Sequence, residues 1–229
     1  MVKNFSRPLK LLFTEPIILL ISLYTSLAYG ILYLFLVSYP VAFGQIRGWK
    51  STLATLPYLG MAIGIISGGL MVISFQPWTN RRTQARGAML PEDRLVPCIV
   101  GSIFFPIGLF WFAWTATYAD VHWIVPTLAG IPIGFGLIAI FLQSINYLID
   151  AYLVFAASAI AANCFLRSLF AAGFPMFARY MFQPKPSGTL GVGWAGSILG
   201  FLALAMVPIP IFFFYKGEAI RKKSKWAPT

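Results

Sequence analysis

Acidic residues and histidine are scarce in this sequence of 229 residues, which holds six Asp or Glu and one His. All six acids fall outside the long apolar stretches, and His122 precedes one of these stretches. Paired carboxylates, metal-ligating clusters, a Walker A loop and a GxSxG motif are therefore missing from the membrane region. Membrane desaturases, which need several histidines, and ATP-driven pumps, which need a nucleotide-binding domain, are excluded. We expect no enzyme activity, no metal and no cofactor.

Long apolar runs dominate what is present, because 59% of the residues are hydrophobic and the mean hydropathy is +0.80. A helix needs about 20 residues to cross about 30 Å of hydrocarbon. Continuous runs of this length indicate helices, since the bilayer core offers no water to the backbone. The sequence therefore predicts an all-α membrane protein with six transmembrane helices in one bundle. The six spans, of 21 to 24 residues each, are Pro16–Tyr39, Leu53–Ile73, Val96–Ala116, Trp123–Ile145, Tyr152–Phe174 and Val192–Tyr215.

The net charge of +11 is distributed unevenly between the two ends of these spans. With a cytoplasmic N-terminus, 12 of the 16 Lys and Arg outside the spans lie on the cytoplasmic side, as the positive-inside rule requires. The charge is therefore a signal of topology and of anionic lipid headgroups, and we expect no nucleic acid partner. The expected organisation is a cytoplasmic segment over 1–15, the bundle over 16–215 with a cytoplasmic loop at about 74–95, and a cytoplasmic basic tail over 216–229.

Small residues and prolines indicate how the helices pack and bend. Gly60, Gly64 and Gly68 form a GxxxGxxxG series on one face of the second span, where glycine permits close approach of a neighbouring helix. Two interpretations stay open for this face: ordinary helix packing, or an interface that slides during a conformational cycle. In the fourth span Pro132 removes a backbone N–H, so we expect this helix to bend there.

Arg167 is the single charged residue inside a predicted span. A charge near the middle of a span costs at least ~2.5–3.5 kcal/mol, so it normally faces the bundle interior or a water-filled cavity. The alternative is that Arg167 lies closer to the outer headgroups and snorkels to them. Because no carboxylate lies in any span, the chain offers no embedded acid for a coupling proton.

Several polar and aromatic residues could line a substrate pathway together with Arg167. A mostly apolar ligand site with a few hydrogen-bonding groups would suit them. Ordinary hydrogen bonding between helices is the alternative for each. The candidates are Tyr29 and Tyr33 in the first span, Gln143 and Asn146 in the fourth, and Asn163 in the fifth, one turn before Arg167.

The order of motifs resembles the C-terminal half of fungal twelve-span drug:proton antiporters of the major facilitator superfamily. The resemblance extends from about Pro8 to Arg221, nearly the whole chain. Its motifs are LFTEPIILLISLYTSLAYGILYLF, RGW, LPEDRLVP, GIPIGFG, NYLIDAY, ANCFLRSLFAAGFPMFARYMF and PIPIFFFYKGEAIR.

This resemblance implies a fold of two six-helix bundles around a central cavity, of which this chain matches the second. It implies proton-coupled export of drugs, polyamines or related small molecules, with a second six-helix bundle as partner, in the plasma membrane. The opening MVKNFSRPLK resembles the central cytoplasmic linker, so we expect a truncated or split form. Two alternatives therefore stay open: half of a transporter, or a non-transporting remnant or regulatory subunit that assembles with a full-length transporter.

Overall fold

The structure is a computed structural model that describes residues 2–87, 90–182, 190–222 and 224. Across these residues the regular secondary structure is entirely helical. The elements, in chain order, are α1 (Val2–Thr14), α2 (Pro16–Tyr39), η1 (Pro40–Ile46), η2 (Leu53–Thr55), α3 (Tyr58–Arg86), η3 (Pro91–Arg94), α4 (Leu95–Ala116), α5 (Ile124–Leu128), α6 (Gly130–Tyr152), η4 (Leu153–Phe155), α7 (Ala156–Phe182), α8 (Gly191–Met206) and α9 (Pro208–Arg221).

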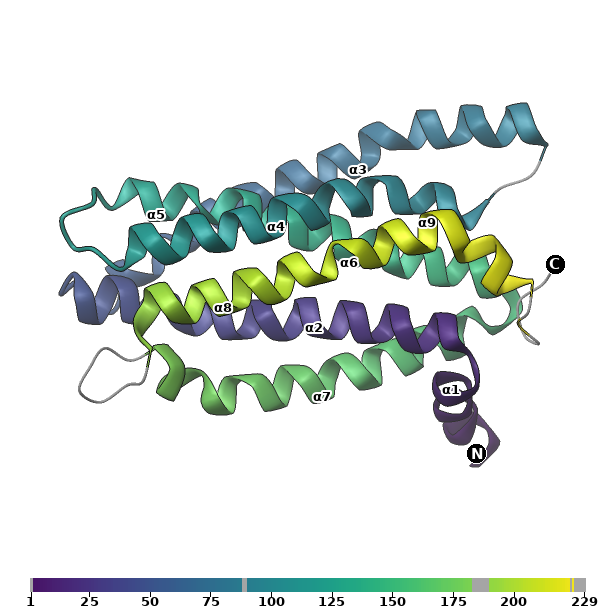
Figure 1. Cartoon of the computed structure of the whole chain (residues 1–229), viewed down its shortest axis with the longest axis horizontal. Helices are drawn as coiled ribbons and strands as arrows, with labels where there is room; N and C mark the ends of the chain where they lie inside the picture. Colours follow the sequence, from purple (N-terminus) through teal and green to yellow (C-terminus); the bar gives the residue numbers. More distant parts are fainter. Residues whose placement is uncertain (1, 88–89, 183–189, 223, 225–229) are drawn as a thin grey trace.

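Five helical segments of the described chain are long and apolar enough to cross a membrane. One of them covers 53 residues and contains α6 and α7 as far as Met176, and the chain reverses between these helices at η4 (Figure 1). The molecule is therefore an all-α integral membrane protein. The segments are Pro16–Ile46, Leu53–Arg86, Pro91–Ala116, Ile124–Met176 and Gly191–Arg221.

The long helices lie side by side, with α2 against α7, α3 against α6, and α4 between α6 and α8 (Figure 1). An aromatic cluster joins α2, α3 and α4 around the fully buried Tyr39. The ring centre of Tyr39 lies 5.0 Å from those of Phe35 and Phe112 and 4.5 Å from that of Tyr58. Such aromatic pairs add about 0.5–1.5 kcal/mol each beyond the burial of their area.

Glycines allow α3 and α6 to approach closely. A Cβ atom on Gly60 or Gly64 would meet the carbonyl oxygen of Thr127 or Ile131, respectively, and one on Gly68 would lie 2.7 Å from the Phe135 carbonyl oxygen. All three predicted packing glycines thus face the backbone at the start of α6 or just before it. Such close backbone contact supplies much of helix association in lipid, where burial from water gives no driving force.

The second predicted span is longer in the structure than in the sequence analysis. Helix α3 continues to Arg86 and ends at Gly87, whose φ of 72° and N–H bond to the Thr83 carbonyl form a left-handed cap. The expected loop at about 74–95 is therefore helical over 74–86, and residues 88–89 lie outside the described chain. Of the expected basic tail over 216–229, α9 includes the part up to Arg221, and residues 223 and 225–229 lie outside the described chain.

The fourth and sixth predicted spans are each interrupted. In the fourth, α5 ends at Leu128 and α6 begins at Gly130, with Pro132 in the first turn of α6. Because Pro132 has no N–H for the Leu128 carbonyl, the break lies one turn before the proline. The sixth is divided at Val207 into α8 and α9, directly before Pro208.

Candidate functional site

Arg167 lies near the middle of α7 and contacts aromatic rings from two other helices. Its guanidinium carbon is 4.9 Å from the ring centre of Tyr29 on α2 and 4.7 Å from that of Phe141 on α6. Its Nη2 donates to the sulfur of Cys164 at 3.6 Å, and its Nη1 is buried with no hydrogen-bond partner among the described residues. The side chain therefore faces the junction of α2, α6 and α7, and the alternative in which it snorkels to headgroups does not describe this arrangement.

Helix α7, which carries Arg167, holds no acidic residue. Asp150, on the same helix as Phe141, is nine residues further along, which corresponds to about 14 Å. Cation–π contact with two rings contributes about 0.5–2 kcal/mol each. Together the two contacts are comparable to the ~2.5–3.5 kcal/mol cost of a charge in the middle of a span, but they supply no opposite charge. Within the described residues the guanidinium forms no ion pair, so its charge is not neutralised.

Asn163, one turn before Arg167, ties α7 to α2. Its Nδ2 lies 2.7 Å from the Thr25 hydroxyl oxygen and 3.4 Å from that of Ser22. Its Oδ1 is buried and has no partner among the described residues. Asn163 thus takes part in hydrogen bonding between helices, and its carbonyl oxygen keeps an unused acceptor.

The structure brings Tyr29, Tyr33 and Arg167 together, but it does not place Gln143 with them. The ring centres of Tyr29 and Tyr33 are 5.1 Å apart in an edge-to-face arrangement. Gln143 is buried, and it lies two positions from Phe141, about 200° around α6, so the two side chains leave opposite faces. Asn146 is half-buried and lies five positions beyond Phe141, further toward the end of α6.

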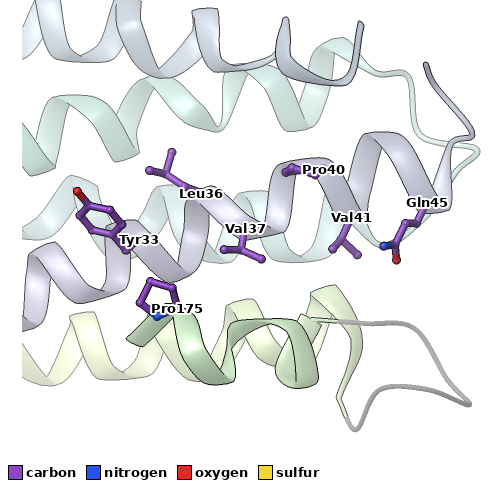
Figure 2. A pocket seen from close by; sticks show the side chains of 7 residues that line it. All are labelled: Tyr33, Leu36, Val37, Pro40, Val41, Gln45 and Pro175. Carbon is purple, nitrogen blue, oxygen red and sulfur yellow. The ribbon is translucent and has the colours of Figure 1, made fainter. Parts of the chain in front are cut away.

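A groove opens beside this cluster, between α2 with η1 on one side and α7 on the other. Figure 2 shows its lining side chains, six of them from α2 and η1 and one from α7. Its volume is about 490 Å³, within the range of small-molecule sites. Apart from Tyr33 and Gln45 the lining is apolar. The lining residues are Tyr33, Leu36, Val37, Pro40, Val41, Gln45 and Pro175. We call this the α2–α7 groove.

One end of the bundle carries a network of ion pairs that sequence reasoning missed. It joins the end of α3, η3, the end of α6 and the end of α9, which gather at the same end of the molecule (Figure 1). The acids of this network are largely buried, with side-chain exposures of 4% for Asp93 and 8% for Glu92. The pairs are Arg82–Asp93 at 3.3 Å, Arg86–Asp93 at 3.1 Å, Arg94–Asp150 at 2.9 Å and Arg221–Glu92 at 3.2 Å.

Arg47, the first residue of the RGW motif, fastens the loop at the opposite end of the bundle. Its Nη1 donates to the Val121 carbonyl at 2.6 Å, and its Nη2 donates to the Tyr118 carbonyl at 3.1 Å and more weakly to that of Thr115 at 3.4 Å. Burial lowers the pKa of this guanidinium below its usual value. The RGW motif therefore holds η1 against the loop between α4 and α5.

Packed apolar helices with a lone arginine embedded among them define a polytopic α-helical membrane protein. The chain is 53% identical over 221 residues to an uncharacterized transporter of Schizosaccharomyces pombe. It is 47% identical over 230 residues to a citrinin biosynthesis cluster MFS (major facilitator superfamily) transporter of Monascus ruber, and 48% identical over 226 residues to a multidrug transporter of Candida glabrata.

These matches cover 96%, 100% and 98% of this chain but 38%, 45% and 38% of the three relatives. The chain therefore spans less than half the length of the curated relatives it matches. It is homologous to the C-terminal half of MFS-type transporters of fungi. No protein-family model matches the sequence, and no solved structure matches it.

Proposed function

We propose that the chain forms one six-helix bundle of a major facilitator superfamily transporter that exports drugs, polyamines or related small molecules. The names of its relatives, which include a multidrug transporter, support this proposal. The 53-residue segment Ile124–Met176 would supply two crossings, because α6 and α7 run in opposite directions, so the five apolar segments would give six crossings. A second six-helix bundle, corresponding to the remainder of the relatives, would complete the transporter.

The observation that carries the proposal is the unneutralised Arg167 at the junction of α2, α6 and α7, beside the α2–α7 groove. If this position served only for helix packing, an apolar residue would fill it at a lower free-energy cost than an arginine. We therefore propose a substrate pathway past Arg167 and Tyr33. Its further members would be Tyr29, Asn146 and Asn163, whereas the buried Gln143, on the opposite face of α6, would take part in packing between helices.

Proton coupling would depend on the second bundle. Five of the six acids lie at or next to the end that carries the ion pairs, and Asp120 lies in the loop at the opposite end. A coupling site needs a titratable group in the pathway, and this half offers no carboxylate there. We propose that the chain alone carries out no proton-coupled transport. We also propose that it lies in the plasma membrane, with both termini and the end that carries the ion pairs facing the cytoplasm.

The test measures efflux of a drug or a polyamine from vesicles under an imposed pH gradient. One preparation holds this chain alone, and a second holds it co-expressed with the N-terminal half of the Candida glabrata multidrug transporter, which is 48% identical to this chain in the matched region. The proposal expects efflux only from the second preparation. Gradient-driven efflux by the chain alone contradicts it. No efflux from a stable complex of the two halves favours the alternative, a non-transporting remnant or regulatory subunit.

A further inference from the structure

We infer that this site takes amphiphilic organic anions, whose anionic group pairs with Arg167 and whose apolar body lies along the α2–α7 groove. The inference rests on the proposed function, because it names the substrate class of the same site. It narrows the proposed substrates from drugs, polyamines and related molecules to one chemical class, on the basis of the charge and shape of the site.

Charge provides the first step. The guanidinium of Arg167 has two aromatic faces and a thiol as its neighbours, and no carboxylate among the described residues neutralises it. In a medium of low dielectric constant, an uncompensated charge attracts an opposite charge far more strongly than it does in water. A ligand that brings an anion would supply the missing partner, whereas a polyamine would add further positive charge next to Arg167.

The second step concerns hydrogen bonding. A guanidinium presents five N–H donors in a planar fork, which matches the two oxygens of a carboxylate. At Arg167 the Nη1 donors are unused and Nη2 donates to Cys164, a weak acceptor at 3.6 Å. The rings of Tyr29 and Phe141 lie against the guanidinium and accept no conventional hydrogen bond from it, so the donors of the buried Nη1 are the ones left for an anion. If a carboxylate bound there, Arg167 would replace its weak contact with the thiol by charge-assisted hydrogen bonds.

Shape provides the third step, because two tyrosines lie between the charge of Arg167 and the α2–α7 groove. Tyr29 contacts Arg167, Tyr33 lines the groove, and their ring centres are 5.1 Å apart. Pro175, on the far side of the groove, lies eight residues along α7 from Arg167, which corresponds to about 12 Å. A molecule with an anionic end and an apolar body of about that length would reach both. Most of the groove offers it apolar side chains (Figure 2).

The experiment compares three ligands of the same shape and different charge. They are 4-(biphenyl-4-yl)butanoate, its primary amide and the matching butylammonium, each measured by equilibrium dialysis against the full chain in phosphatidylcholine nanodiscs. Binding to empty nanodiscs is subtracted. We expect the anion to bind about tenfold or more tightly than the amide, since hydrogen bonds to charged groups exceed neutral ones by about a factor of two in free energy. The ammonium should bind most weakly.

Four substitutions locate the effect. Arg167→Gln should remove the preference for the anion, and Arg167→Lys should keep part of it, because an ammonium preserves the charge without the fork. Arg81→Gln is the matched control, since it removes the same charge from an exposed position on α3 and should leave the preference unchanged. Val37→Phe should weaken all three ligands together by filling the groove.

Equal binding of anion and amide to the unmodified chain overturns the inference even if Arg167→Gln does not fold. A preference for the anion that persists in folded Arg167→Gln also overturns the inference. So does loss of this preference when the second bundle is present, because Arg167 would then pair with an acid of that bundle. The proposed function has a separate test. If the complex of the two halves binds the anion but shows no efflux, the result contradicts transport and leaves the substrate class standing. Efflux of neutral compounds without an Arg167-dependent anion preference contradicts the substrate class alone.

Discussion

Gly64 of α3 lies so close to Ile131 of α6 that a Cβ atom on the glycine would collide with the Ile131 carbonyl oxygen. The contact is backbone against backbone, so no side chain can rotate away to make room. Gly134 repeats the arrangement from the opposite helix, because a Cβ atom there would meet the backbone of Met61. The two helices are therefore held at a distance that only glycine at these positions permits.

Gly64→Ala should destabilise the bundle by about 1–3 kcal/mol, the usual cost of overpacking. Gly69→Ala, on the same helix, is the matched control, because a Cβ atom at Gly69 meets nothing within 4 Å and the gain in helix propensity is the same. The measurement is the unfolding midpoint of each purified variant in detergent. Equal midpoints for the two variants would mean that α3 and α6 separate at little cost.

Arg47→Lys should destabilise the end of the bundle that carries the RGW motif. An ammonium keeps the charge but cannot reach carbonyls of Val121 and Tyr118 with the spread of the guanidinium fork. The bond to Val121 is half-buried and the bond to Tyr118 is exposed, so each lost bond should cost about 1 kcal/mol, below the cost of a fully buried unpaired acceptor. The expected sign is faster amide hydrogen exchange across the loop between α4 and α5. Lys50→Arg, at an exposed neighbouring position, is the control, and an unchanged exchange pattern in Arg47→Lys would contradict the prediction.

The sequence predicted most of the helices because apolar runs with proline at their boundaries carry a local signal. The first predicted span, Pro16–Tyr39, has the same bounds as α2, with a proline at its first position and another directly after it. The extension of α3 to Arg86 was missed, because its last residues are polar and give no hydropathy signal although they remain helical. Helix lengths near the membrane surface therefore need more than hydropathy.

The surroundings of Arg167 could be predicted only in part. Its isolation from acids followed from the absence of carboxylates in the spans. The contact with Phe141 did not, because it depends on how α6 is rotated against α7, and nothing distinguishes this residue among 21 phenylalanines. The pairing of Asp93 with Arg82 and Arg86 likewise depends on the fold of η3 against the end of α3.

The topology prediction places the end with the ion pairs in the cytoplasm. Gln84→Cys, at an exposed position near the end of α3, should react with a membrane-impermeant thiol reagent only after cells are opened. The background is Cys98→Ala with Cys164→Ala, which removes both native thiols. Asp120→Cys, in the exposed loop at the opposite end, should react in intact cells. Reversal of the two labelling patterns would invert the topology.

Asp93→Asn should weaken the network that joins α3 to η3, because one nearly buried carboxylate there serves two guanidinium groups. Its two oxygens lie 3.3 Å from Arg82 and 3.1 Å from Arg86, and its side chain is 4% exposed. Asparagine has the same shape but no charge, so both arginines lose charge-assisted bonds worth about 1.5–3 kcal/mol each at most, reduced by the partial exposure of the arginines. We expect a lower unfolding midpoint and easier proteolysis after Arg82 and Arg86. Glu218→Gln is the control: its pair with Lys222 at 2.8 Å is exposed on both sides, so solvent and salt screen it and its loss should change the midpoint little. If the two variants lose the same stability, the buried acid adds nothing beyond an ordinary surface pair. A selective loss in Asp93→Asn would show that the end of α3 is held to the bundle by charge, since its close packing onto α6 lies in the first half of the helix, at Gly60, Gly64 and Gly68.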